Sequence, residues 1–161
     1  MYKYTSEEIN EHRIVRNKHE EETDDLFITW INKHFPNTYI INRTDEWENY
    51  DYMCYNKIKQ TYSKIEAKLR NLDETKYNKY REQGFCLSYD KMNTCDVVVY
   101  IIPYSNEILT IKTSKIKDLL NQNKIHIVQK LVNKYQYTKR KEKHDETLLI
   151  IPYSEWKVYN M

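Results

Sequence analysis

The segment that decides the fold is YDYMCYNKIKQTYSKIEAKLR, residues 50–70, in which an aspartate and a Glu-Ala-Lys triplet lie in two successive strand-like runs. Successive side chains of a β-strand point to opposite faces of the sheet. In the second run the apolar side chains therefore share one face, and Glu66, Lys68 and Arg70 share the other. An acid and two cations on one face are unusual for a purely structural strand, and they indicate a site that handles charged groups.

The chemistry of these side chains favours a metal and a phosphate. Asp51 and Glu66 offer carboxylate oxygens from adjacent strands, and such hard oxygen ligands are the ones that Mg²⁺ prefers. Lys68, on the face of Glu66, can orient a water molecule or neutralise charge that develops on a phosphate. The pattern predicts a metal-dependent phosphoryl-transfer site.

The Glu-x-Lys triplet by itself is weak evidence, because the chain contains three of them, at 66–68, 74–76 and 155–157. A motif gains weight only from its structural context. Only the triplet at 66–68 lies in an alternating strand pattern with an aspartate-bearing strand before it.

In that context the spacing resembles the motif of the PD-(D/E)XK nuclease superfamily. Glu66 follows Asp51 after fourteen intervening residues, within Ile65-Glu66-Ala67-Lys68, and Arg70 lies two positions further on. The residue before the aspartate is Tyr50, where the family motif has proline. The resemblance implies a restriction-endonuclease-like α/β fold, in which a mixed central sheet is flanked by helices in the order α-β-β-β-α-β.

The order of expected elements agrees with this core. Leu26, Phe27, Trp30 and Ile31 recur at helical spacing, and Pro36 ends the pattern. We expect one domain, residues 1–161, with a core over about 6–104 and an extension over about 105–161. The expected core elements are a helix at 6–35, a strand at 38–43, the Asp51 strand, the Glu66 strand, a helical segment at 74–92 and an apolar strand at 97–102. The extension is expected to hold an apolar run at 108–111, a helix or turn at 114–120, a helix near 124–136 and a strand at 148–151, and its β-content to extend the core sheet.

The resemblance also implies roles for individual residues. Asp51 and Glu66 would hold Mg²⁺ or Mn²⁺, with the backbone carbonyl of Ala67 as a further ligand, and Lys68 would position the attacking water. The expected enzyme is a hydrolase of phosphodiester bonds, most simply a DNA endonuclease. Two alternatives stay open: an RNA-cleaving viral-type endonuclease, and a catalytically silent module that binds nucleic acid or protein.

An acid on the first helix often joins the metal site in this superfamily. Asp24 and Glu20 lie one helical turn apart, on the face that turns to the sheet. Either is a candidate auxiliary ligand, and the alternative is that both belong to an exposed acidic half-helix. His19, beside Glu20, is the candidate for a histidine-containing metal site like that of the viral RNA-cleaving members.

The net charge of +2 hides an asymmetry along the chain. Residues 1–51 hold 12 acids and 6 Lys or Arg, whereas residues 52–161 hold 12 acids and 20 Lys or Arg. A basic portion beside an acidic site fits phosphate binding, and nucleic acid is the expected partner, with DNA favoured over RNA and a homodimer left open. An ordinary solvated surface is the alternative. The candidate nucleic-acid contacts are Arg70, Lys79, Arg81 and the basic run Lys139, Arg140 and Lys141, which follows two tyrosines.

Other classes of protein are disfavoured. The chain has no run of eighteen apolar residues and no apolar segment behind a basic start, so we expect neither a membrane span nor a secretory signal. Cys54, Cys86 and Cys95 are odd in number and lack zinc spacing, which favours a reducing intracellular compartment, cytoplasm or nucleus, with a viral or phage origin open. The single glycine, Gly84, excludes a glycine-rich phosphate loop.

Overall fold

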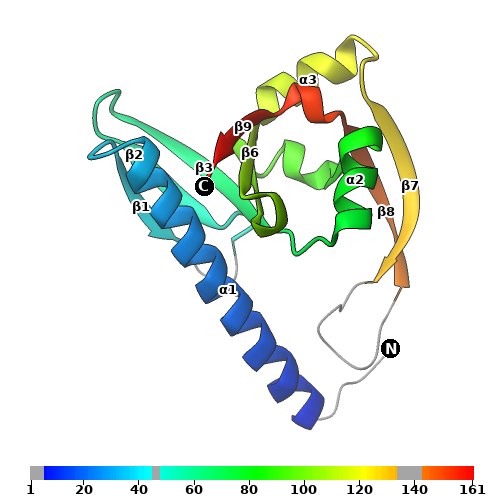
Figure 1. Cartoon of the computed structure of the whole chain (residues 1–161), viewed down its shortest axis with the longest axis horizontal. Helices are drawn as coiled ribbons and strands as arrows, with labels where there is room; N and C mark the ends of the chain where they lie inside the picture. The colour runs from blue at the N-terminus through cyan, green and yellow to red at the C-terminus, as the bar shows by residue number, and fades with distance from the viewer. Residues whose placement is uncertain (1–5, 45–47, 134–142) are drawn as a thin grey trace.

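The computed structural model describes residues 6–44, 48–133 and 143–161, with the side chains of 17–44, 48–128 and 147–161. The chain forms a mixed α/β structure whose layers are visible in Figure 1. In chain order the elements are α1 (Ser6–His34), β1 (Tyr39–Arg43), β2 (Tyr52–Asn56), β3 (Thr61–Leu69), α2 (Glu74–Gln83), β4 (Phe85–Ser88), the 3₁₀ turn η1 (Tyr89–Met92), β5 (Val97–Ile102), η2 (Pro103–Ser105), β6 (Glu107–Lys112), α3 (Thr113–Asn121), β7 (His126–Asn133), β8 (Lys143–Ile151), η3 (Tyr153–Glu155) and β9 (Lys157–Asn160).

A six-stranded sheet in the order β1-β2-β3-β5-β6-β9 forms the centre of the molecule. β3 and β5 pair in parallel, and the other neighbours in this sheet pair antiparallel. The sheet is therefore mixed, as expected, and the predicted succession α-β-β-β-α-β is present with β4 inserted before β5.

The two faces of this sheet are covered differently. α1 lies across one face, where Phe27, Trp30 and Ile31 pack on residues of β2, β3 and β5. On the other face Val98 and Tyr100 of β5 pack against β4, η1, α3 and β8. Because side chains alternate along β3, its apolar residues face α1 while Glu66 and Lys68 turn to the opposite side, toward the second layer.

A second sheet, of three strands in the order β4-β8-β7, was not expected. The segment 74–92 was predicted as helix, but α2 stops at Gln83 and the chain turns at Gly84 into β4. The helix predicted near 124–136 is wrong, because His126–Asn133 is strand β7, paired antiparallel with β8. Within the extension, β6 and β9 do extend the central sheet, whereas β7 and β8 belong to the second one.

The ends of two elements follow local rules. α1 begins at Ser6 and its last residues precede Pro36, as expected. At the start of α2 the Asp73 side chain accepts a hydrogen bond from the Lys76 N–H at 2.8 Å, which satisfies one free donor of the first turn. None of the helices in the described part of the chain has the length and apolar character needed to cross a membrane.

Candidate active site

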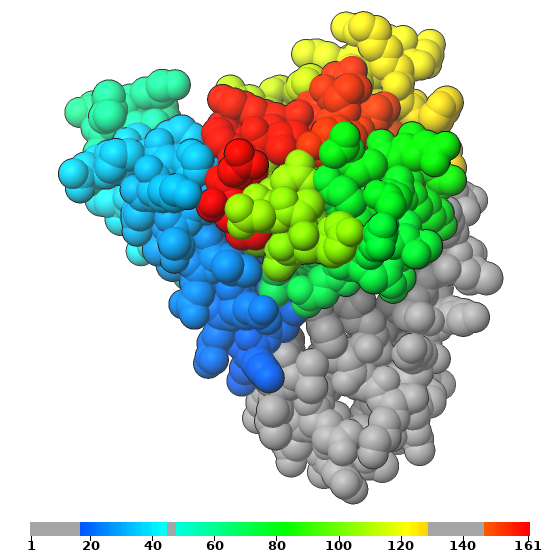
Figure 2. Space-filling model, in the orientation of Figure 1, coloured from blue at the N-terminus to red at the C-terminus, as the bar shows by residue number. Residues whose placement is uncertain are grey.

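A polar cavity of about 650 Å³ opens where α1 meets the end of β3 and the start of α2. In the space-filling view the described part of α1, in blue, adjoins the green surface of the β3–α2 region at the lower edge of the coloured surface (Figure 2). The cavity is lined by His19, Glu20, Thr23, Arg43, Asp51, Glu66, Ala67, Lys68, Leu69, Arg70, Asn71, Leu72, Lys76 and Tyr80.

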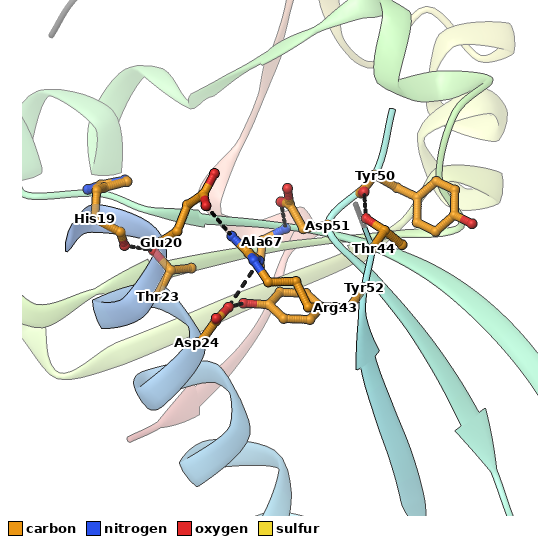
Figure 3. A network of polar contacts seen from close by, with 10 residues as sticks. All are labelled: His19, Glu20, Thr23, Asp24, Arg43, Thr44, Tyr50, Asp51, Tyr52 and Ala67. Atoms are coloured by element: carbon orange, nitrogen blue, oxygen red, sulfur yellow. Dashed lines mark hydrogen bonds and ion pairs between the residues drawn. The ribbon is translucent and has the colours of Figure 1, made fainter. Parts of the chain in front are cut away.

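Asp51 precedes β2 and is fastened to β3 on both sides of Glu66. Its N–H donates to the Ile65 carbonyl at 2.9 Å, and its Oδ2 accepts from the Ala67 N–H, also at 2.9 Å. Figure 3 shows this carboxylate above the main chain of Ala67. The two hydrogen bonds fix the Asp51 side chain beside that of Glu66.

Glu66 is the most buried ionisable residue that lines the cavity, with 6% of its surface exposed. Its Oε1 lies 3.0 Å from Nζ of Lys91, whose ammonium also donates to the Asn49 carbonyl at 3.3 Å. Lys91 belongs to η1, which packs on the face of the central sheet opposite α1. Lys91 could not be predicted as part of the site from the sequence, because nothing in its local pattern links it to the Glu66 strand.

Burial sets the acidity of the two carboxyl groups. The pKa of Asp51 is raised above its ordinary value of 3.8, chiefly because burial disfavours the charged form. The pKa of Glu66 is raised above 4.5 for the same reason and, second, by the negative charge of Asp51. Lys91 and Lys68 oppose both shifts. Two buried acids with raised pKa values and fixed cationic neighbours are typical of functional sites.

Lys68 and Arg70 continue the polar face of β3 into the cavity. Lys68 is half-buried, and its charge lowers the pKa of both carboxyl groups. The Arg70 guanidinium lies over the rings of Tyr80 and Tyr100, at 5.5 and 5.3 Å from their centroids. These ring contacts hold the guanidinium at the cavity wall.

Arg43 of β1 forms ion pairs with two acids of α1. Its guanidinium lies 3.0 Å from the Asp24 carboxylate and 3.8 Å from that of Glu20 (Figure 3). Asp24 also accepts a hydrogen bond from the Tyr52 hydroxyl, and the Arg43 guanidinium covers the Tyr52 ring. Both acids face the sheet, but Asp24 is engaged by Arg43 and Tyr52 and does not line the cavity, whereas Glu20 does.

The predicted nucleic-acid contacts separate into three groups. Arg70 lines the cavity, together with Arg43 and Lys76, which the sequence reading did not single out. Lys79 is exposed on α2 and lies outside the cavity lining. Arg81 donates to the Tyr77 hydroxyl at 3.1 Å and lies 3.8 Å over the Tyr153 ring, so it is also outside. The basic run at 139–141 falls outside the described residues.

The donor set fits a hard divalent cation. Asp51 and Glu66 present carboxylate oxygens beside one another, and the main chain of Ala67 lies between them. Among the described side chains no three histidine, cysteine, aspartate or glutamate groups gather into a ready-made metal cluster. A metal at this position would therefore take its remaining ligands from main-chain carbonyls, water or substrate.

Comparison with known proteins adds little to this geometry. No family model matches the chain, and no curated protein matches it. Among solved structures the chain is similar to a nuclease from a fusselovirus, with 17% sequence identity, a TM-score of 0.49, and coverage of 98% of this chain and 90% of that chain.

Proposed function

We propose that the protein is a Mg²⁺- or Mn²⁺-dependent nuclease that hydrolyses phosphodiester bonds in nucleic acid, with DNA as the favoured substrate. The observation that carries the proposal is that Asp51, Glu66 and Lys68 line one polar cavity. Arg70 and Lys76 line the same cavity and offer positive charge to a phosphate backbone, and Arg43, paired with the acids of α1, lines it as well.

Each residue has a separate task in this reaction. Asp51 and Glu66 are the proposed metal ligands, with the Ala67 carbonyl as a third, and the metal would act as a Lewis acid toward the phosphate. Lys68 orients the attacking water and stabilises the negative charge that builds on the phosphate oxygens. The negative charge of Asp51 contributes to the raised pKa of Glu66, and a divalent ion held by both carboxylates would relieve this repulsion.

The cations around the cavity bind and orient the substrate. Arg70 presents a guanidinium already ordered by two tyrosine rings, and Lys76 extends from the first turn of α2. A guanidinium held in this way binds phosphate oxygens at little cost in conformational entropy. Arg70 and Lys76 lie on the α2 side of the carboxylate pair, so phosphates flanking the cleaved bond are expected to run toward α2.

RNA cleavage is the second candidate function, and one observation favours it. His19 and Glu20, on α1, line the same cavity as the two carboxylates. The resemblance to the PD-(D/E)XK superfamily includes viral RNA-cleaving members with a histidine on an early helix. DNA and RNA substrates must therefore be tested side by side.

The test is a cleavage assay on single- and double-stranded DNA and RNA with Mg²⁺, Mn²⁺ or EDTA. We expect metal-dependent cleavage by the wild type and none by Glu66→Gln. Lys68→Ala should lower turnover by about 10²-fold or more while nucleic-acid affinity stays nearly unchanged, because the lysine acts on the transition state. Lys79→Ala, outside the cavity, serves as the control and should retain wild-type turnover.

Binding of nucleic acid without cleavage would contradict the enzyme proposal. If the wild type binds nucleic acid yet cleaves none of the four substrates with either metal, the chain is a binding module. If Lys68→Ala and Lys79→Ala reduce turnover equally, the lysine at 68 has no special role in the reaction.

A further inference from the structure

Lys91 makes an ion pair with the candidate metal ligand Glu66, although it does not belong to the strand motif. Its ammonium lies 3.0 Å from the Glu66 carboxylate, and its side chain is only 21% exposed. Its positive charge also opposes the rise that burial causes in the pKa of both Asp51 and Glu66. The two carboxylates thus share a cation from outside the central sheet.

Hydrogen bonds hold the main chain of Lys91, whereas its ammonium is held by the ion pair with Glu66 and a weaker contact with the Asn49 carbonyl. The Lys91 carbonyl accepts hydrogen bonds from the N–H of Cys95 at 3.4 Å and from the Cys95 thiol at 3.3 Å. The next residue, Met92, is buried in the core between the two sheets. A lysine side chain has a flexible four-carbon stem, so its ammonium can leave Glu66 without any change in the backbone.

A divalent ion and this ammonium cannot both bind Glu66 well. An ion held by Asp51 and Glu66 would carry two positive charges within a few ångströms of the present position of Nζ. Like charges at such a distance repel strongly in a partly buried site. Without metal, by contrast, Glu66 needs a cation, because an ionised carboxylate buried without a partner is very unfavourable.

We propose that Lys91 is a tethered counter-ion of Glu66 that a divalent metal displaces when it binds, so that Lys91 sets the metal affinity of the site. The inference rests on the metal-dependent function proposed above and adds a positioning residue to it. Lys91 stabilises the metal-free protein and weakens metal binding, and both effects come from the same ion pair.

The first test measures Mn²⁺ binding by isothermal titration calorimetry at pH 8 for the wild type, Lys91→Met, Lys91→Arg and the control Lys79→Met. Lys91→Met removes the competing charge, so we expect it to bind Mn²⁺ about tenfold more tightly and to melt at a lower temperature without metal. Lys91→Arg keeps the charge and should resemble the wild type, as should Lys79→Met. A merely structural lysine would lower the melting temperature without raising the affinity.

The second test needs no variant of Lys91. Brief acylation of the wild type with acetic anhydride, read by peptide mass spectrometry, reports the exposure of each lysine amine. Adding Mg²⁺ should increase acylation of Lys91 several-fold and leave that of Lys79 unchanged. Unchanged or reduced labelling of Lys91 with metal would show that the ammonium stays on Glu66.

The outcomes separate the two proposals. If Mn²⁺ binds the wild type but binds Lys91→Met equally or more weakly, the counter-ion role is wrong while the metal site stands. If Mn²⁺ binds none of the four proteins, the proposed metal-dependent function fails, and the role of Lys91 fails with it.

Discussion

At the scale of single residues, the site holds two acids in an environment that penalises their charge. Asp51 and Glu66 lie side by side, and burial raises the pKa of each. The stability of the metal-free protein is reduced wherever both groups are ionised. Functional sites commonly trade stability for activity in this way.

Asp51→Asn is therefore expected to stabilise the metal-free protein at pH 8. Asparagine removes the charge but can still accept the hydrogen bond from the Ala67 N–H. An acid with a raised pKa binds its proton more tightly in the folded state, so its favourable contribution is present below the ordinary value of 3.8 and is lost as the pH rises through the folded pKa. Melting temperatures in EDTA should show a gap over the wild type that closes as the pH falls toward 4.

Metal should reverse this order. With saturating Mg²⁺ the wild type is expected to gain stability by linkage, whereas Asp51→Asn should gain little. If Asp51→Asn melts below the wild type at pH 8 in EDTA, the carboxylate is stabilising as it stands and the electrostatic reading is wrong.

The residues of the site were predictable from sequence only where they share a strand pattern. Glu66 and Lys68 could be assigned to one face because alternation in a strand is a local property. Lys91 could not be found, because it reaches Glu66 through the packing of η1 beneath the sheet, and Arg43 reaches the acids of α1 through the pairing of β1 with β2.

At the scale of elements, the same limit explains the wrong helix. Residues 125–132 carry apolar side chains at spacings that fit a helix as well as a strand. This segment forms a strand because it pairs antiparallel with β8, which lies later in the chain. Local propensity loses to long-range pairing in such segments.

Gly84 is the position where α2 gives way to β4, and its backbone explains why the predicted helix stops there. Its φ of 106° and ψ of 159° lie in a region open essentially to glycine alone. A Cβ at this position would lie 2.8 Å from Cγ2 of Ile150 and 2.9 Å from the Ile151 carbonyl oxygen. Both the backbone conformation and the close approach of β8 therefore exclude a side chain at this position.

Gly84→Ala should consequently lower the free energy of unfolding by about 2 kcal/mol or more. Gln83→Ala, at the exposed neighbouring position, should change it by less than about 0.5 kcal/mol. Urea denaturation of both variants provides the comparison. Equal stability of the two would mean that β4 and β8 do not meet as closely as described.

At the scale of the whole molecule, the uneven charge of the chain has a spatial meaning. The acidic segment contributes α1, whose Glu20 and Asp24 pair with Arg43, and the basic segment contributes β3 and α2. The cavity lies where the two meet, so acids for a metal and cations for phosphates are brought together by the fold.

Two lysines of α2 provide a test of the path that nucleic acid takes across the molecule. Lys76 lines the cavity and Lys79, one turn further on, does not. In a Glu66→Gln background, Lys76→Gln should reduce the slope of log binding constant against log salt concentration by about one unit, and Lys79→Gln should leave it unchanged. Fluorescence anisotropy with a labelled duplex measures both slopes. Equal slopes for the two variants would place the backbone elsewhere.

Synthesis on the ribosome imposes an order on this architecture. β4 emerges well before its partner β8, because α3 and β7 lie between them in the chain. Until β8 arrives, Phe85 and Leu87 of β4 lack the neighbours that bury them, and η1 lacks one of the elements against which it packs. Lys91 is carried by η1. A nascent chain would thus present both carboxylates before η1, which carries the lysine paired with Glu66, has all of its packing partners.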